Sequence, residues 1–392
     1  MASLAFLAGK RDVRQIDDGF IGTVDSTPGA LVDFNLDETQ TELRKLAVEL
    51  LGREVTVGRL EAHEASGAPY DVGLWRSLAQ AGLLGVCLPE EAGGAGLGPV
   101  ELAVILREIG GHVAPVPAEQ SLVAALVIAR HGSGGQREAL APLADGEIVL
   151  ASALREPGRD LGAAPTTTAR RDGGGWVLNG AKGTVSYAAE ASRILVPAVT
   201  DGGIGLFLVE PAAMTLRPVT VTTGEPAATL ILADAPGELV GAEDGEAFDE
   251  LRRLALAGII AVSSGVLAGA LALTTEYIRT RKQFGRALAE FQAVTVQIAD
   301  VYIAGRALDV AVWSGAWLLA EGSAEDAETD LTVGALSVTD SALRALYTCQ
   351  HLHGGIGVDV TYPLHRYFAW GKHHAHLLGG VEARLDTIGA RV

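Results

Sequence analysis

Five residues, Arg281-Lys282-Gln283-Phe284-Gly285, end a long run of helical periodicity, and Glu290-Phe291-Gln292 follow shortly after. A planar guanidinium can hold a diphosphate in a bidentate manner, which a lysine cannot do as well. Arg-Lys alone would equally fit the solvated basic end of a helix, where cations interact favourably with the dipole. The aromatic, glycine and glutamine residues at fixed spacing favour a ligand-contacting role for the whole motif.

A second motif lies about sixty residues further on, Gln350-His351-Leu352-His353-Gly354-Gly355-Ile356-Gly357, ahead of Tyr362-Pro363. Glycines let backbone amides approach a phosphate or an adenosine closely. The alternative is a helix that ends in a glycine cap. No segment of the chain reads as a dinucleotide-binding βαβ unit, so these glycines do not indicate that kind of site.

Composition sets limits on function. The chain has 392 residues and a net charge of −18, from 48 acidic and 30 basic residues. A field of that sign disfavours nucleic acids and anionic membranes as partners, although local basic residues could still bind an anionic ligand such as coenzyme A. The only cysteines, Cys87 and Cys349, form no disulfide framework and are predicted to be small buried hydrophobes. We expect a cytoplasmic protein.

Periodicity predicts three structural regions after a tail at 1–33, which lacks the basic region of a secretory signal. Helical spacing dominates 34–146, short β-rich runs separated by glycine turns occupy 147–240, and long helices fill 241–392. The predicted fold is α+β, with an N-terminal helical domain, a small β-barrel or sandwich, and a C-terminal four-helix bundle. Glycines and serines interrupt the apolar run from Leu254 to Ala270, which we read as a buried helix below membrane-spanning length.

The two motifs and the three-part layout resemble the acyl-CoA dehydrogenase family over essentially the whole chain after residue 34. The resemblance implies FAD as cofactor, an acyl-CoA substrate and an electron-transfer flavoprotein as electron acceptor. It also implies that Arg281 reaches across a subunit interface to the pyrophosphate of FAD in a neighbouring protomer. The cofactor-binding residues carried over are Arg281, Phe284, Gln292, Gln350 and Gly354.

The family's catalytic glutamate has no counterpart here. Its aligned position is Leu378, or Gly379 with one gap, and the position used by a minority branch is Ala255. None of these side chains can accept the α-proton of a thioester. We therefore predict no catalytic residue in this chain. Glu382 and Asp386, one and two turns further on, are candidates for a relocated base, although solvated helix faces are the simpler interpretation.

The flavin-cradling part of the β region also departs from the family pattern. Arg155 replaces a small hydroxyl residue, and Thr184 stands where the family carries a tryptophan, two residues before Ser186. Groups lent to a neighbour's FAD are thus present, while those for the chain's own FAD are degraded. The chain resembles the non-catalytic subunit of actinobacterial heterotetramers that act on steroid side-chain thioesters. The alternatives are a self-sufficient homotetramer and a non-enzymatic scaffold.

Histidines gather near the C-terminus. Those at 373 and 376 share a helix face, but no acidic or cysteine ligand joins them at a recognised metal-binding spacing. We predict no metal site, and expect packing against a partner subunit or a ligand tail. The residues concerned are His351, His353, His365, His373, His374 and His376.

Overall fold

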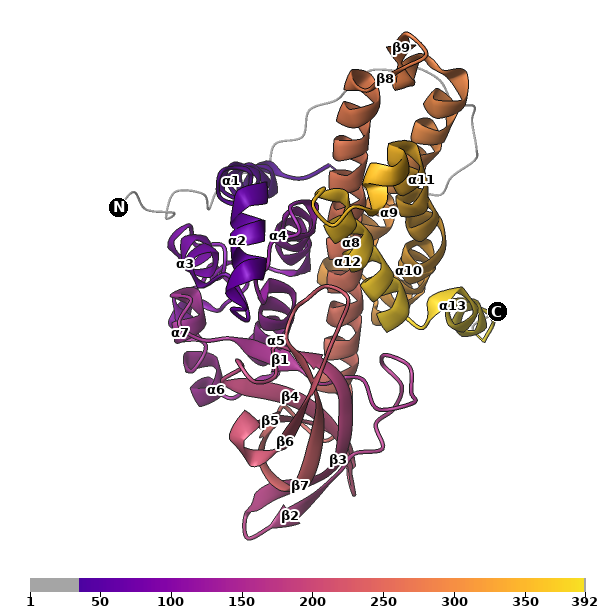
Figure 1. Ribbon diagram of the computed structural model, residues 1–392. Coiled ribbons are helices and arrows are strands. Elements are labelled where there is room, and N and C mark those ends of the chain that lie inside the picture. Colours follow the sequence, from indigo (N-terminus) through magenta and orange to yellow (C-terminus); the bar gives the residue numbers. More distant parts are fainter. Residues whose placement is uncertain (1–34, 391–392) are drawn as a thin grey trace, which may run out of the picture.

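The computed structural model describes residues 35–390, so the predicted tail at 1–33 lies outside the described residues. The chain begins with a layer of helices (Figure 1). Asp37 caps the first of them by accepting a hydrogen bond of 2.8 Å from the Gln40 amide, as the sequence predicts. The elements of this layer are α1 (Glu38–Glu54), α2 (Val57–Ser66), α3 (Val72–Gln80), η1 (Glu90–Ala92), α4 (Pro99–Gly111), α5 (Ala118–His131), α6 (Gly134–Glu138) and α7 (Ala141–Ala144).

Seven strands form the central region, which confirms the predicted small barrel. The order is β1-β4-β2-β3-β7-β5, pairing of β5 with β4 closes the barrel, and β6 pairs with β7. Sequence reasoning missed β2, because four of its five residues are exposed and it carries no apolar alternation. The strands are β1 (Leu150–Ser152), β2 (Thr168–Asp172), β3 (Gly175–Ser186), β4 (Arg193–Thr200), β5 (Gly203–Val209), β6 (Thr215–Val219) and β7 (Ala227–Val240), with η2 (Pro211–Ala213) between the fifth and sixth.

Long helices make up the C-terminal region, as predicted. A π-helical turn, η4 (Val338–Ala342), divides the helical segment 324–353, and the register changes there. The other elements are α8 (Glu246–Thr280), β8 (Lys282–Gln283), β9 (Arg286–Ala287), η3 (Leu288–Glu290), α9 (Gln292–Glu321), α10 (Ala324–Ser337), α11 (Leu343–His353), η5 (Gly354–Val358), α12 (Leu364–Leu377) and α13 (Gly380–Gly389).

Helix α8 runs from the barrel to the β8–β9 hairpin and packs on α4 at very close range (Figure 1). A Cβ added to Gly265 would lie 1.8 Å from the Arg107 carbonyl oxygen, and one added to Gly110 would lie 2.1 Å from that of Val262. Only glycine permits this backbone approach. The small residues that interrupt the apolar run thus serve helix packing, and the helix continues through them.

A buried polar network joins α4, α8 and α9. The Arg107 guanidinium donates to both carboxylate oxygens of Asp309, at 2.9 and 3.2 Å, and Ser264 donates to the same carboxylate at 2.5 Å. A buried charge is tolerated when it is paired and hydrogen-bonded in this way. The network fixes the register of α4 against α8 and α9, the two helices that flank the hairpin.

The prediction that no apolar stretch reaches membrane-spanning length was wrong. Among the described residues, α8 (35 residues) and α9 (30 residues) are both long and apolar enough by length and composition. The most apolar window of α8 is 78% buried inside the chain, as expected of a core helix, whereas that of α9 is only 28% buried. Length and composition alone are weak evidence for a membrane span.

Candidate functional site

The Arg281–Gly285 motif forms a β-hairpin at the far end of the bundle. Its turn residues Phe284 and Gly285 have φ values of 52° and 81°, and positive φ at both central positions is what a type I′ turn requires. Glycine adopts this conformation freely, but phenylalanine does so at a cost. The Phe284 side chain is nevertheless 94% exposed, and its edge-to-face contact with Phe291 leaves nearly all of its surface in water, so packing within the described chain does not offset the cost.

Arg281 lies just before the hairpin and leaves α8 in an extended conformation, with its amide bonded to the Tyr277 carbonyl oxygen at 2.8 Å. Its guanidinium makes no hydrogen bond or ion pair with any side chain within 35–390 and remains available to a ligand. The Phe291 ring contacts both sides of the hairpin. It lies 6.4 Å edge-to-face from Phe284 and 4.0 Å from the guanidinium carbon of Arg286.

The structure places the glycine motif at the same end of the bundle. Tyr277, one turn before Arg281, stacks on His353 with ring centroids 4.3 Å apart, and Gly354 follows with φ of 64°. The Gln350 amide donates to the Gly357 carbonyl oxygen at 3.2 Å, which closes the turn. Gln292, the first residue of α9, is exposed beside the hairpin. Roles for the predicted cofactor-binding residues remain predictions, but their positions are compatible with one extended ligand site.

A second feature is a groove of about 810 Å³ between the barrel and α12. Arg155 and Arg159 from the β1–β2 loop, Thr184 from β3, and Lys372 and His376 from α12 line it. Its lining includes the imidazoles of His373 and His376 but no phenylalanine, tyrosine or tryptophan, so it offers no large aromatic surface for a planar ring. Its basic lining favours anions.

Glu156, in the same loop as Arg155, has a structural role. Its carboxylate accepts from the fully buried Lys182 ammonium at 2.8 Å and from the Thr166 and Thr167 amides at 2.8 and 2.9 Å. These hydrogen bonds hold the pKa of Glu156 far below its usual value despite the opposing effect of burial. They anchor the β1–β2 loop to the barrel.

The end of α12 carries no carboxylate. Leu378 is fully buried in the main core, Leu377 lines the groove, and Gly379 has φ of 79°. Glu382 and Asp386, the candidates for a relocated base, are both exposed on α13 and do not line the groove.

Sequence reasoning missed two largely buried glutamates. Glu119 Oε2 on α5 lies 3.8 Å from His374 Nε2. The other ring nitrogen of His374 lies 2.8 Å from Ser263 Oγ, which itself donates to the Ile259 carbonyl oxygen at 2.7 Å. His374 must therefore donate from Nδ1, and Nε2 presents a lone pair to Glu119. Burial raises the pKa of Glu119 to about 8, with repulsion from Glu225 adding to the shift.

The second largely buried glutamate is Glu225, in the β6–β7 loop. Its carboxylate accepts from Ser186 Oγ at 2.5 Å and lies 3.6 Å from His373 Nε2. Burial raises the pKa of Glu225 to about 7, against the lowering effect of the Ser186 hydrogen bond. Burial also lowers the pKa of His373 to about 4 and that of His374 to about 3. The cluster of Glu119, Glu225, His373 and His374 is thus mostly uncharged at neutral pH.

The C-terminal histidines do not converge on one point. His353 lies near Tyr277 and Tyr362, His365 donates from Nδ1 to the Tyr362 carbonyl oxygen, and His373 and His374 are buried within the chain. His374 is buried by its own chain, and packing of the C-terminal histidines against a ligand or a partner stays a prediction. Within 35–390, no group of three or more candidate ligands could hold a metal ion.

Glu119 gave little signal, because an acidic residue in the first turn of a helix is ordinary. Nothing in the sequence marks Glu225 either, because it follows a polar turn, Thr222-Thr223-Gly224, where a glutamate is ordinary.

Comparisons with known proteins match both helical regions to family models. The family described as acyl-CoA dehydrogenase, N-terminal domain, matches residues 37–147, and acyl-CoA dehydrogenase, C-terminal domain, matches residues 251–392. Among curated relatives, acyl-CoA dehydrogenase FadE28 of Mycobacterium tuberculosis is 39% identical over 81% of this chain and 91% of its own length.

Two solved structures are similar over nearly their whole length. A single-residue variant of the Tcur3481-Tcur3483 steroid ACAD superposes with a TM-score of 0.85 and 43% identity, over 90% of this chain and 97% of that one. The ChsE4-ChsE5 complex from Mycobacterium tuberculosis gives a TM-score of 0.85 and 31% identity, over 92% of this chain and 98% of that one.

Proposed function

The chain belongs to the acyl-CoA dehydrogenase family, and from this premise we propose that it is the non-catalytic subunit of a heteromeric acyl-CoA dehydrogenase. It completes the FAD site of a homologous subunit, which supplies the catalytic carboxylate. One observation carries the proposal: the exposed hairpin with Arg281 and Phe284 is complete, while the turn at 377–380 has no proton acceptor.

FAD does not fit the chain's own groove. Thr184 offers no ring surface, and the Ser186 hydroxyl is already bonded to the buried Glu225 carboxylate. At the hairpin the fit is good, since Arg281 has free donors for a diphosphate and Phe284 projects into solvent. FAD bound mainly in the partner would supply the hydride acceptor for the acyl β-carbon. This chain's part is to hold the cofactor with Arg281, Phe284, Gln292, Gln350 and Gly354.

The surface of α9 supports assembly with another subunit. Its exposed apolar side chains form one face of the helix. Contact of apolar surface with water is unfavourable in free energy, and such faces mark protein interfaces. The residues are Val296, Tyr302, Ile303, Val310 and Trp317, which are 37–63% exposed.

The substrate class and surroundings follow from the same relatives. The name of the steroid ACAD variant favours an acyl-CoA with a bulky, steroid-derived acyl group, and the paired names in both solved structures favour an assembly of unlike subunits. We propose a heterotetramer that passes electrons to an electron-transfer flavoprotein, as the family resemblance implies. The two free, buried cysteines fit a cytoplasmic location.

Co-expression with a homologous subunit that carries the glutamate tests the proposal. We expect one FAD per pair of unlike subunits, and a colourless, inactive chain when it is produced alone. Arg281→Ala in the complex should weaken FAD retention about 10- to 100-fold, the value of a charge-assisted phosphate contact. Arg279→Ala is the matched control, because Arg279 is an exposed arginine two residues earlier. A yellow, active homotetramer would refute the assignment.

One observation favours a second candidate, a self-sufficient dehydrogenase. Glu225 is a carboxylate with a pKa near 7, bonded to Ser186 at the end of β3. A general base is most effective with such a pKa. Glu225→Gln discriminates the two, since it abolishes acyl-CoA oxidation only if this chain performs the proton abstraction itself.

A further inference from the structure

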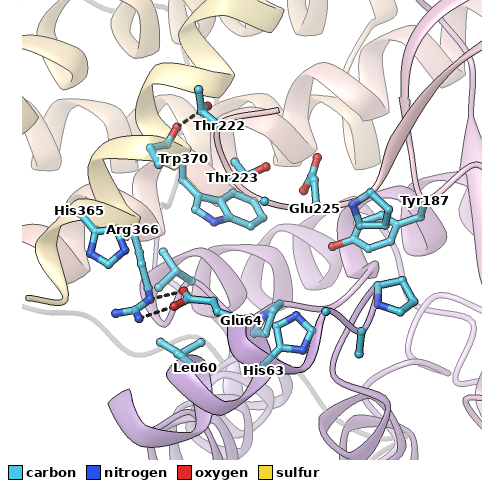
Figure 2. A pocket seen from close by; sticks show the side chains of 18 of the residues that line it. Leu60, His63, Glu64, Tyr187, Thr222, Thr223, Glu225, His365, Arg366 and Trp370 are labelled. Atoms are coloured by element: carbon cyan, nitrogen blue, oxygen red, sulfur yellow. Dashed lines mark hydrogen bonds and ion pairs between the residues drawn. The ribbon is translucent and has the colours of Figure 1, made fainter. Parts of the chain in front are cut away.

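A second cavity, of about 560 Å³, opens between α2, the α4–α5 connection, the β6–β7 loop and α12 (Figure 2). Its volume lies in the range of cavities that hold small organic molecules. None of the residues placed at the cofactor hairpin lines it, so the cavity is separate from the proposed FAD-completing surface.

The cavity has aromatic and aliphatic walls. Trp370 from α12 and the buried Tyr187 after β3 provide two ring surfaces, and Leu60, Val113 and Pro226 complete the apolar lining. In Figure 2 the Glu64–Arg366 pair and Tyr187 lie on opposite sides, with the Trp370 indole between them. A flat apolar body would fit such walls.

Polar groups without partners are concentrated at the same place. Within 35–390, five buried side-chain nitrogen or oxygen atoms have no hydrogen-bond partner, and three of them belong to residues of this cavity. The three are Arg366 Nη1, Glu190 Oε2 and Thr223 Oγ1. Each buried, unsatisfied group costs about 1–3 kcal/mol, so their gathering around one cavity points to a ligand that supplies the missing bonds.

The Arg366 side chain has a fixed position in the cavity wall. Its side chain is only 7% exposed, and a fork of two hydrogen bonds to Glu64, at 2.6 and 2.7 Å, fixes it. Arg366 donates to Glu64 from Nε and Nη2, and the Glu64 carboxylate neutralises the guanidinium charge. Nη1 is left as a donor of an ion pair that has no net charge. A neutral acceptor oxygen suits this donor.

The carboxylates of the cavity argue against an anionic ligand. Glu64, Glu190 and Glu225 line it, against one arginine and two histidines, His63 and His365. An anion would approach three carboxyl groups. Glu190 requires a donor and Arg366 an acceptor, and a hydroxyl group is the simplest substituent that provides both.

We infer that this cavity binds a neutral, ring-bearing small molecule with at least one hydroxyl group. The rings lie against Trp370 and Tyr187, and the hydroxyl bonds with Thr223 Oγ1 and with Arg366 Nη1 or Glu190 Oε2.

Equilibrium dialysis of the full chain against three probes of one shape tests the inference. 2-Naphthol carries the hydroxyl, naphthalene lacks it, and 2-naphthoate is an anion. We expect saturable binding of 2-naphthol, and weaker binding of both others. Naphthalene bound equally well, naphthoate bound better, or no saturable binding of 2-naphthol would each overturn the inference.

Thr223→Val adds a signature that a merely structural threonine would not give. The variant loses an unsatisfied hydroxyl at nearly constant volume, so the thermal midpoint of the free chain should stay constant or rise. Its affinity for 2-naphthol should fall about two- to twelve-fold, the value of one hydrogen bond. Thr329→Val, at an exposed position of α10, is the control and should leave the affinity unchanged. An unchanged affinity in Thr223→Val would remove this threonine from the site and contradict the assignment.

Discussion

The Tyr277 ring stacks on the His353 imidazole, with centroids 4.3 Å apart and planes inclined by 21°, and the Tyr277 hydroxyl donates to the His353 carbonyl oxygen at 3.3 Å. These two residues come from motifs far apart in the sequence. Tyr277 lies one turn before Arg281, and His353 immediately precedes Gly354. Their contact joins the hairpin to the glycine turn, so both parts of the proposed cofactor surface move as one unit.

Tyr277→Leu should therefore disturb cofactor retention more than folding. The variant keeps apolar bulk but loses the stacked pair, which is worth about 0.5–1.5 kcal/mol. We expect a small change in thermal midpoint and a clear loss of FAD from the complex on gel filtration. Tyr347→Leu is the control, because Tyr347 forms an aromatic pair with Phe368 instead, away from the hairpin. Equal FAD loss in both variants would contradict the coupling.

Phe284 is held in a costly conformation with little packing in its own chain beyond the edge-to-face contact with Phe291. With φ of 52° and 94% exposure, it should be replaceable by glycine with no loss of stability. Phe284→Gly removes a left-handed penalty of about 1–2 kcal/mol, partly offset by the entropy of glycine. We expect an unchanged or higher thermal midpoint for the isolated chain and weaker FAD retention in the complex. Gly58→Ala provides a comparison that alters stability without touching the hairpin. Retention of FAD by Phe284→Gly would remove the proposed role.

The close contact between α4 and α8 predicts how two glycine-to-alanine substitutions differ in their effect on stability. Gly265→Ala places a Cβ 1.8 Å from the Arg107 carbonyl oxygen and must separate the two helices, whereas nothing lies within 4 Å of a Cβ at Gly58 on α2. We expect Gly265→Ala to destabilise by more than about 3 kcal/mol and Gly58→Ala to stabilise by about 0.5–1 kcal/mol. Urea unfolding followed by circular dichroism measures both. A neutral Gly265→Ala would show that the helices can separate freely.

The predictable features were those carried by contiguous residues. The motif from Arg281 to Gly285 is contiguous in the sequence. The spacing of leucines in α1 and the continuous apolar run of β4 are likewise local patterns. The groups that sequence reasoning missed depend on contacts between regions. Glu119 and Glu225 come from the helical layer and the barrel, and only tertiary structure brings them to the two histidines of α12. The conformation of Phe284 was equally hidden, because its φ is opposed to the ordinary preference of the residue.

The same cluster makes the stability of the chain depend on pH in a defined window. Burial raises the pKa of Glu119 to about 8 in the folded chain, against an ordinary value of 4.5. The folded state then binds more protons than the unfolded one, so this stabilisation is complete below pH 4.5 and disappears as the pH rises towards 8. His373 and His374 act in the opposite direction, because their pKa values are lowered, but their effect is confined to pH values below about 6.5. Glu225 follows Glu119 up to about pH 7.

Between about pH 7 and 8.5, Glu119 is thus the main group of the cluster that still titrates, and the thermal midpoint should fall with rising pH. Glu119→Gln is neutral at every pH and can still donate to His374 Nε2, so its midpoint should stay nearly flat across this interval. Glu382→Gln, on the exposed face of α13, should retain the slope of the unmodified chain. Scanning calorimetry at half-unit pH steps compares the three proteins. Parallel curves for Glu119→Gln and the unmodified chain would mean that Glu119 is ionised throughout, and that the buried cluster holds its charge by some other contact.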